Sequence, residues 1–157
     1  MTAALEIKQA ATDDDYRLVS GLFREYLDSL PFDIDFQDVD TDVEHPTSMY
    51  GPPDGCAFLG LVDGECVGVV GVRRFDDSAC ELKRMYVRPS SRGTGLGRAL
   101  AEAAIAAARE LGYQRMLLDT IEDMQAANAL YELLGFDQIP AYRHNPLPGD
   151  RYYALEL

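Results

Sequence analysis

Cysteine and histidine are scarce in this sequence, and tryptophan is absent. The three cysteines stand at positions 56, 66 and 80 with no CxxC spacing, and the two histidines, His45 and His144, lie far from them and from each other. An odd number of unpaired cysteines argues against a disulfide framework, and scattered histidines argue against a structural zinc site. We therefore predict no metal site, and we expect Cys80 to be a small buried side chain rather than a nucleophile.

Long apolar runs are missing as well. No window approaches the roughly 18 uninterrupted apolar residues of a membrane span, and residues 1–10 lack the basic start and apolar run of a signal peptide. Hydrophobic residues make up 47% and charged residues 26% of the chain, which is typical of globular rather than disordered proteins. We predict a cytoplasmic protein without a membrane partner, folded as a single domain over residues 1–157.

Positive charge is in short supply, with 14 Lys and Arg against 27 Asp and Glu and a formal net charge of -13. Most of the surface would therefore repel duplex nucleic acid, and we predict no nucleic-acid partner. The bases are concentrated, however: residues 73–98 hold seven basic and three acidic side chains, whereas residues 1–50 hold 12 acids and three bases. This basic segment indicates a local anion site, or else arginines that only decorate strand faces.

Hydrophobic periodicity predicts seven strands: Leu5–Gln9, Cys56–Val62, Cys66–Phe75, Ala79–Val87, Arg115–Asp119, Phe136–Ile139 and Tyr152–Leu157. It predicts helices from the N-cap Thr12 to Pro31, after Gly97 as far as Gly112, and over Met124–Leu134. Phe32–Val43 fits either a second short helix or a loop. The element order β-α-α-β-β-β-α-β-α-β-β predicts an α/β (α+β) fold, with helices on both faces of a mixed sheet of six to seven strands.

A glycine loop, Arg92-Gly93-Thr94-Gly95-Leu96-Gly97, joins a predicted strand to a helix. Consecutive amides at a helix N-terminus bind anions, so the loop predicts a phosphate site, and a purely structural tight turn is the alternative. A dinucleotide fingerprint would need glycine where Arg98 or Leu100 stands, and a P-loop would need a Gly-Lys dipeptide, which the chain lacks. The spacing excludes both of those nucleotide-binding motifs.

Three segments together resemble the acyl-CoA-binding core of the GNAT superfamily of N-acetyltransferases: Glu81-Leu-Lys-Arg-Met-Tyr-Val87, the glycine loop, and Asn128-Ala-Leu-Tyr131-Glu-Leu-Leu-Gly135-Phe136. The family signature Gln/Arg-x-x-Gly-x-Gly/Ala is met by Arg92, Gly95 and Gly97. The resemblance spans Cys56 to Ile139 and implies a GNAT-like, mostly antiparallel sheet. It implies transfer of acetyl from acetyl-CoA directly to a primary amine of a small molecule or peptide. A non-catalytic acyl-CoA-binding or regulatory module is the alternative.

The resemblance also implies where acetyl-CoA lies: in a V-shaped opening between Ala79–Val87 and Arg115–Asp119. The backbone of Met85, Tyr86 and Val87 would pair with the pantetheine arm. Asn128 would hydrogen-bond that arm, or else is simply solvated. The pyrophosphate would lie on the amides of Arg92, Gly93, Thr94, Gly95, Leu96, Gly97 and Arg98.

For catalysis, the resemblance places Tyr131 as the acid that protonates the CoA sulfur, the Val87 N–H as donor to the thioester oxygen, and Glu81 as general base. Two of these roles have a plainer alternative. Tyr131 could be a tyrosine of the core, and Glu81 could form an ion pair on the sheet, in which case an ordered water would be the base. His144 is an alternative base. Acetyl and longer acyl donors are not distinguished.

The acceptor prediction rests on charge alone. The resemblance implies that the amino-terminal helices and the late loop from Arg143 to Asp150 line the acceptor side. The first of these regions is acidic: Asp28, Asp33, Asp35, Asp38, Asp40, Asp42 and Glu44. These acids predict a cationic acceptor, such as a polyamine-like amine, an amino-acid-like amine, or a lysine or amino terminus of a peptide, or else only a solvated acidic face. Homodimers are common in the family, and the last strand offers an edge for pairing, so a homodimer stays open.

Overall fold

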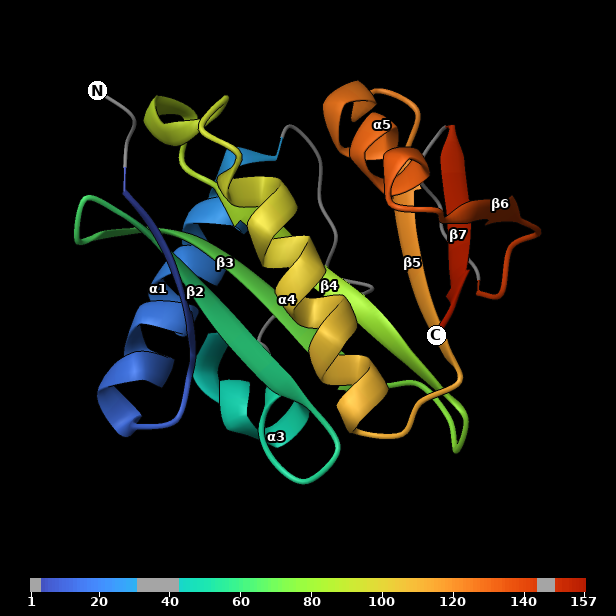
Figure 1. Ribbon diagram of the computed structural model, residues 1–157, viewed down its shortest axis with the longest axis horizontal. Coiled ribbons are helices and arrows are strands. Elements are labelled where there is room, and N and C mark those ends of the chain that lie inside the picture. Colours follow the sequence, from blue (N-terminus) through green and yellow to red (C-terminus); the bar gives the residue numbers. More distant parts are fainter. Residues whose placement is uncertain (1–3, 31–42, 144–148) are drawn as a thin grey trace.

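The computed structural model describes residues 4–30, 43–143 and 149–157 (Figure 1). In this part of the chain seven strands form one sheet in the order β1-β2-β3-β4-β5-β7-β6. Their bounds are β1 Leu5–Gln9, β2 Cys56–Val62, β3 Glu65–Arg74, β4 Ala79–Val87, β5 Arg115–Ile121, β6 Asp137–Ile139 and β7 Asp150–Glu156. Only the β4–β5 pair is parallel. The predicted mixed, mostly antiparallel sheet is confirmed.

Helices cover both faces of this sheet, as predicted (Figure 1). One face carries α1 (Asp13–Ser29) and α3 (Pro46–Tyr50), and the opposite face carries α4 (Leu96–Glu110) and α5 (Gln125–Leu133), with a 3-10 turn at Pro89–Ser91 before α4. Each layer has its own apolar core: Phe23 packs between α1 and the sheet, and Leu100 packs beneath α4. No helix of the described ranges is long and apolar enough to cross a membrane.

The start of α1 follows directly from its sequence. Thr12 is the N-cap and accepts a hydrogen bond from the Asp15 amide, while the Asp15 carboxylate accepts one from the Thr12 amide. This reciprocal capping box satisfies two amides that a helix end otherwise leaves unpaired. Lys8 of β1 adds an ion pair of 2.9 Å to Asp15, which ties the helix start to the neighbouring strand.

Some predicted boundaries shift. The short helix α3 was not expected from the sequence, and Pro46 stands in its first turn. The predicted helix or loop at Phe32–Val43 lies almost wholly outside the described residues. β5 runs two residues past its predicted end, to Ile121, and β7 begins two residues before its predicted start, at Asp150, because these residues pair with each other. β7 also pairs with β6 on its other side, so the last strand is not the edge strand that was expected.

Two features of β4 shape the site. Parallel pairing with β5 involves only Ala79–Glu81, so the two strands separate beyond that point, as the predicted V-shaped opening requires. A β-bulge interrupts the pairing with β3, and Arg84 there has φ of 57°. The bulge breaks the alternation of side chains, so that Met85 and Val87 pack with the α4 layer instead of sharing the face of Glu81.

Candidate active site

A groove of about 540 Å³ lies at the end of β4, between the start of α4 and α5. Eight of the residues predicted from the sequence line it: Met85, Tyr86, Val87, Arg92, Gly93, Leu96, Gly97 and Tyr131. They come from three segments that the separation of β4 from β5 brings to one opening. The lining is mainly apolar toward α5, where Ala127 and Leu130 lie, and polar at the glycine loop.

The glycine loop makes a tight turn into α4. Gly93 and Gly95 have φ of 81° and 89°, values that glycine adopts without strain, and Gly95 is the helix N-cap. The N-cap residue Gly95 has no side chain to cap α4, and the Leu96 amide donates to the Thr94 hydroxyl over a long 3.4 Å. The amides of Gly97 and Arg98 that follow remain for another hydrogen-bond acceptor. Arg92 Nε donates to the Val87 carbonyl over 3.2 Å, which ties the loop to the end of β4.

Not every predicted loop residue lines the groove. Thr94 donates its hydroxyl to the Ser91 carbonyl over 2.7 Å, a contact that shapes the turn. Arg98 points along the outside of α4, where Nε lies 2.7 Å from Glu102 Oε1. These two side chains, together with Gly95, are therefore placed beside the groove rather than in its wall.

Tyr131 projects from α5 into the groove and is buried against Phe136 and Tyr153, with ring centroids 5.7 and 6.4 Å away. Burial raises the pKa of its phenol well above the usual range, so the hydroxyl keeps its proton at every physiological pH. The hydroxyl makes no hydrogen bond to any residue that the structure describes. The hydroxyl therefore carries a proton and offers a donor that no described residue uses.

Asn128, also on α5, is turned away from this groove. Its Nδ2 donates to the Ile121 carbonyl over 2.9 Å, and the residue lines a separate polar depression with Glu122 and Arg151. Its Oδ1 is buried with no partner among the residues described. The contact to Ile121 fixes the end of β5 where that strand has separated from β4, a structural role that the sequence did not suggest.

A small cavity of about 80 Å³ continues from the groove between the separated strands. It shares Met85 and Tyr131 with the groove and is also lined by Lys83 and Asp119. The Lys83 ammonium lies 3.2 Å from Asp119 Oδ1, and both side chains are almost fully buried. Burial lowers the pKa of Lys83 to about 8, against the opposing effect of Asp119.

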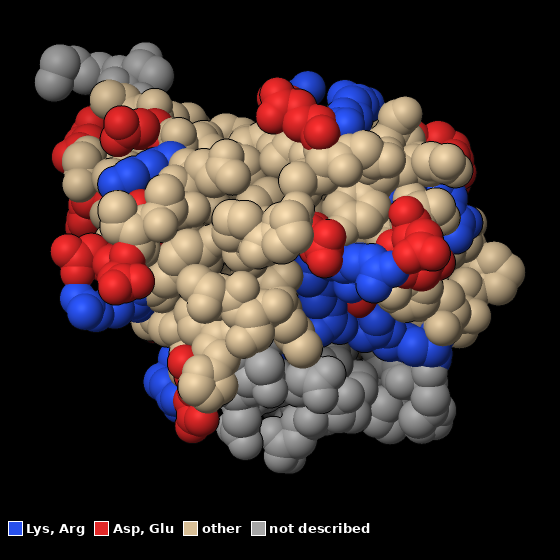
Figure 2. All heavy atoms as spheres, turned by 90° about the horizontal axis from the view of Figure 1, so that it is seen from below, with Lys and Arg blue, Asp and Glu red and all other residues tan. Residues whose placement is uncertain are grey.

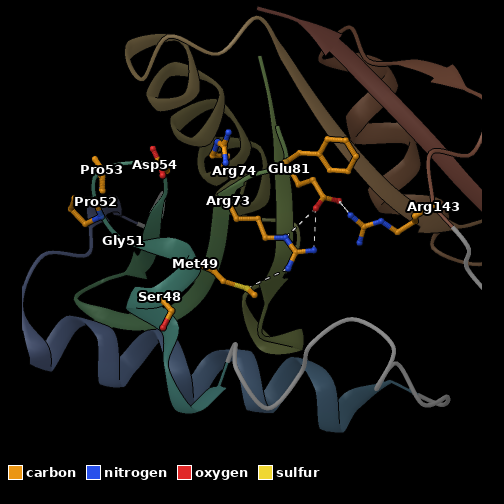
Figure 3. Close-up of a pocket in the computed structure, with 11 residues that line it drawn as sticks. Ser48, Met49, Gly51, Pro52, Pro53, Asp54, Arg73, Arg74, Glu81 and Arg143 are labelled. Carbon is orange, nitrogen blue, oxygen red and sulfur yellow. Dashed lines mark hydrogen bonds and ion pairs between the residues drawn. The ribbon is translucent and has the colours of Figure 1, made fainter. Parts of the chain in front are cut away.

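Glu81 lies further along the same face, at a second cavity of about 460 Å³ (Figure 3). Arg73 of β3 and Arg143 of the segment before β7 point toward it from opposite sides. Glu81 Oε1 accepts from Arg73 Nε at 3.0 Å, and Oε2 accepts from Arg143 Nη2 at 2.6 Å and from the Tyr142 hydroxyl at 2.9 Å. The carboxylate is only 1% exposed and takes hydrogen bonds on both oxygens.

The charges around Glu81 determine its ionisation. Burial by itself raises the pKa of the carboxyl, but Lys83, Arg73 and Arg143 outweigh it, and the pKa is lowered. A carboxylate whose pKa is lowered is a weaker proton acceptor than an unpaired one. The plainer expectation, an ion pair on the sheet, therefore describes the geometry of Glu81, and its role as a base stays a prediction.

The remaining predicted residues are placed as follows. Cys80 is fully buried, and burial raises the pKa of its thiol to about 12, as expected for an unreactive side chain. His144 lies outside the described residues, as do five of the seven acids behind the predicted cationic acceptor. The two described acids, Asp28 and Glu44, are exposed.

Seen from below, basic side chains gather on one part of the molecular face (Figure 2).

Sequence reasoning missed the Lys83–Asp119 pair, and it named neither Arg73 nor Arg143 as a partner of Glu81. Arg73 and Lys83 belong to the basic segment, so the sequence signal existed without a specific location. Arg143 was expected only as the start of a loop on the acceptor side, because it lies 62 positions from Glu81 and reaches it only through the folded sheet.

Comparisons with known proteins find acetyltransferases. The family model described as "Acetyltransferase (GNAT) family" matches residues 19–136. The "Uncharacterized N-acetyltransferase C1271.07c" of Schizosaccharomyces pombe is 39% identical over 146 residues, covering 92% of this chain and 88% of that protein. The N-acetylaspartate synthetase of Rattus norvegicus is 37% identical over 99 residues, covering 62% of this chain and 33% of that protein.

Solved structures show the same fold. The acetyltransferase from Streptococcus agalactiae superposes with a TM-score of 0.77 and 26% sequence identity, over 98% of both chains. The structure of yncA from Salmonella typhimurium, solved with its cofactor acetyl-CoA, superposes with a TM-score of 0.68 over 98% of this chain and 94% of that one. At 20% identity, this second likeness concerns the fold alone.

Proposed function

The chain belongs to the GNAT family of acetyltransferases, and on that premise we propose that it transfers the acetyl group of acetyl-CoA to the primary amine of a small molecule. The observation that carries the proposal is the groove at the separated ends of β4 and β5. It joins an uncapped helix N-terminus, the free edge of β4 and the unused Tyr131 hydroxyl in one opening.

In this proposal the two ends of the groove hold the two ends of the donor. The amides after the glycine loop face the pyrophosphate, because a helix N-terminus carries about half a positive charge and unpaired N–H groups. The edge of Met85, Tyr86 and Val87 is the backbone that pairs with the pantetheine arm. Asn128 is assigned to holding Ile121 rather than to the arm, given its contact to that carbonyl.

Acetyl transfer then needs three groups. The amine nitrogen forms a bond to the acetyl carbon, the C–S bond breaks, and the Tyr131 phenol gives its proton to the departing thiolate. The Val87 N–H is the proposed donor to the thioester oxygen. The amine loses its proton to a water or to Glu81, and the donors already on Glu81 favour the water.

The acceptor suggested by the relatives is anionic rather than cationic. The name of the rat relative specifies N-acetylaspartate, whose parent amine carries two carboxylates. The acceptor-side cavity beside Glu81 is lined by three arginines, Arg73, Arg74 and Arg143. We therefore favour a carboxylate-bearing amine over the cationic acceptor predicted from the acidic segment.

The experiment that tests the function is thermal stabilisation by acetyl-CoA, CoA, NAD and ATP, followed by thiol release with a panel of amines. A ligand at 100 times its Kd adds about 2.7 kcal/mol, a shift that is readily measured. We expect stabilisation by the two CoA compounds only, and thiol release that depends on an amine. Stabilisation without release for any amine would instead indicate the non-catalytic module. No stabilisation by either CoA compound would overturn the donor site.

A further inference from the structure

The cavity beside Glu81 has the chemistry of a carboxylate-binding site. Three guanidinium groups, from Arg73, Arg74 and Arg143, line about 460 Å³ of space that also borders α3 (Figure 3). The carboxylates on its wall are those of Glu81, which is buried, and Asp54, which is exposed. Guanidinium is the side-chain group best matched to a planar carboxylate, because two parallel N–H groups meet its two oxygens.

Glu81 fixes the orientation of two of these arginines. Arg73 uses Nε and Nη2 on Oε1, at 3.0 Å each, and Arg143 uses Nη2 on Oε2 at 2.6 Å. Arg143 is also held over the Tyr142 ring, with its guanidinium carbon 5.2 Å from the ring centroid. Both guanidinium planes are therefore fixed before any ligand arrives, which reduces the entropy lost on binding.

Donor capacity remains after these contacts. Arg143 has Nε and Nη1 without a partner among the residues described here. Arg73 Nη1 donates to the Met49 thioether at 3.5 Å, so Arg143 is the arginine that offers unused donors to a ligand. Arg74, about half exposed, pairs with Asp77 at the rim.

The cavity and the donor groove lie along the same strand, β4, at Glu81 and at Met85, Tyr86 and Val87 respectively. Glu81 and Lys83 are two positions apart on one face of β4, about 7 Å along a strand, and Lys83 lines the small cavity that shares Met85 and Tyr131 with the donor groove. The positive charge of Lys83 also acts on Glu81. A small acceptor whose amine reaches the groove would thus have its acid group near the arginines.

We infer that this cavity binds a carboxylate of the acceptor, which is a small amine bearing at least one acid group, such as an acidic amino acid. Arg143 binds the carboxylate, Arg73 adds positive charge to the cavity wall, and Glu81 is a positioning residue that holds both arginines. The inference rests on the proposed acetyl transfer and specifies its acceptor class.

The first test compares acceptors that differ only in charge. Aspartate, glutamate, asparagine and glutamine, which bear one or two carboxylates, are assayed against asparaginamide, glutaminamide and a polyamine, which bear none, with acetyl-CoA as donor. We expect kcat/KM to be at least tenfold higher for the acceptors that bear a carboxylate. Preference for the polyamine or for the two carboxylate-free amides would overturn the inference while leaving acetyl transfer intact.

The second test uses Arg143→Gln and Arg143→Lys. Loss of a charged bidentate contact is expected to raise KM for the preferred acid 10- to 100-fold, with kcat within a few-fold of wild type. Lysine keeps the positive charge but lacks the two parallel N–H groups of a guanidinium. The KM of Arg143→Lys should therefore lie between those of wild type and Arg143→Gln. Arg109→Gln, an exposed arginine at the far end of α4, is the matched control and should leave KM unchanged.

A third measurement separates this inference from the proposed function. Calorimetric titration of aspartate and glutamate into the CoA-bound protein detects acceptor binding without turnover, and stabilisation by acetyl-CoA confirms that each variant is folded. Binding that is lost in Arg143→Gln while stabilisation by acetyl-CoA is kept would support the arginine site even if no acetyl transfer were found. Equal KM and equal binding in wild type and Arg143→Gln would overturn it.

Discussion

Arg143 Nη2 donates a hydrogen bond of 2.6 Å to Glu81 Oε2, joining the middle of β4 to a segment 62 positions later in the chain. Glu81 is almost fully buried and its partner is about one-fifth exposed. A buried carboxylate needs such partners, because an unpaired one would lose its hydration without compensation. The contact links β4, the strand that would bind the acetyl donor, with the segment beside the acceptor cavity. It therefore joins the two halves of the candidate site.

We predict that Tyr131→Phe lowers kcat by about 10²-fold or more, the usual contribution of a positioned acid, and leaves acetyl-CoA affinity near that of wild type. The ring contacts to Phe136 and Tyr153 do not depend on the hydroxyl. Steady-state kinetics and calorimetry measure the two effects. Tyr153→Phe, in the same aromatic cluster but outside the groove wall, is the control. An unchanged kcat in Tyr131→Phe would remove this tyrosine from the mechanism.

Gly97 offers a matched pair of substitutions in the groove. A Cβ at this position would have its nearest neighbours, Val87 Cγ2 and Leu130 Cδ2, at 3.9 and 4.0 Å, so the fold accommodates it. We expect Gly97→Ala to bind acetyl-CoA and Gly97→Glu to lose most of that binding, because a carboxylate would repel the phosphates. Thermal stabilisation by acetyl-CoA reports both. Similar stabilisation of the two variants would place the donor elsewhere.

Glu81→Gln distinguishes a positioning residue from a general base. Glutamine retains one acceptor oxygen but loses the charge that holds Arg73 and Arg143. We predict a rise of about tenfold or more in KM for an acidic acceptor, a smaller change in kcat, and a pH profile of kcat with the same acidic limb. The pH–rate profiles of both proteins are the measurement. A large fall in kcat with loss of the acidic limb would make Glu81 the base.

Lys83 gives a pH dependence of stability with a definite sign. Its pKa is about 8 in the folded protein and 10.5 ordinarily, because burial disfavours the charged form. Between these values the unfolded chain holds a proton that the folded chain has released, so Lys83 makes the protein more stable as pH rises.

We therefore expect the free energy of unfolding of wild type, relative to Lys83→Met, to increase from pH 8 to pH 10 in urea titrations. Lys8→Met is the control, because Lys8 is about half exposed and its ion pair with Asp15 raises its pKa. The difference in the free energy of unfolding between wild type and Lys8→Met should therefore stay flat over the same pH range. A constant difference in the free energy of unfolding between wild type and Lys83→Met would mean that the Lys83 ammonium of the folded protein stays protonated over this pH range.

Much of the fold could be predicted from sequence because its signals are local. The capping box of Thr12 and Asp15, the glycines with positive φ before α4, and the alternation along each strand act within a few residues. Boundaries set by pairing were less accurate. β5 extends to Ile121 because β7 pairs with it that far, and neither strand alone contains that information.

The candidate site divides in the same way. The sequence by itself determined the prediction of the glycine loop, Tyr131 and the β4 edge as site elements, because they belong to three segments that resemble the GNAT core. Only the tertiary structure decided that Asn128 turns to Ile121 and that Arg73 and Arg143 meet on Glu81. The β4 bulge and the packing of β7 beside β5 bring these groups together, and such contacts depend on spatial proximity between residues that are distant in the chain.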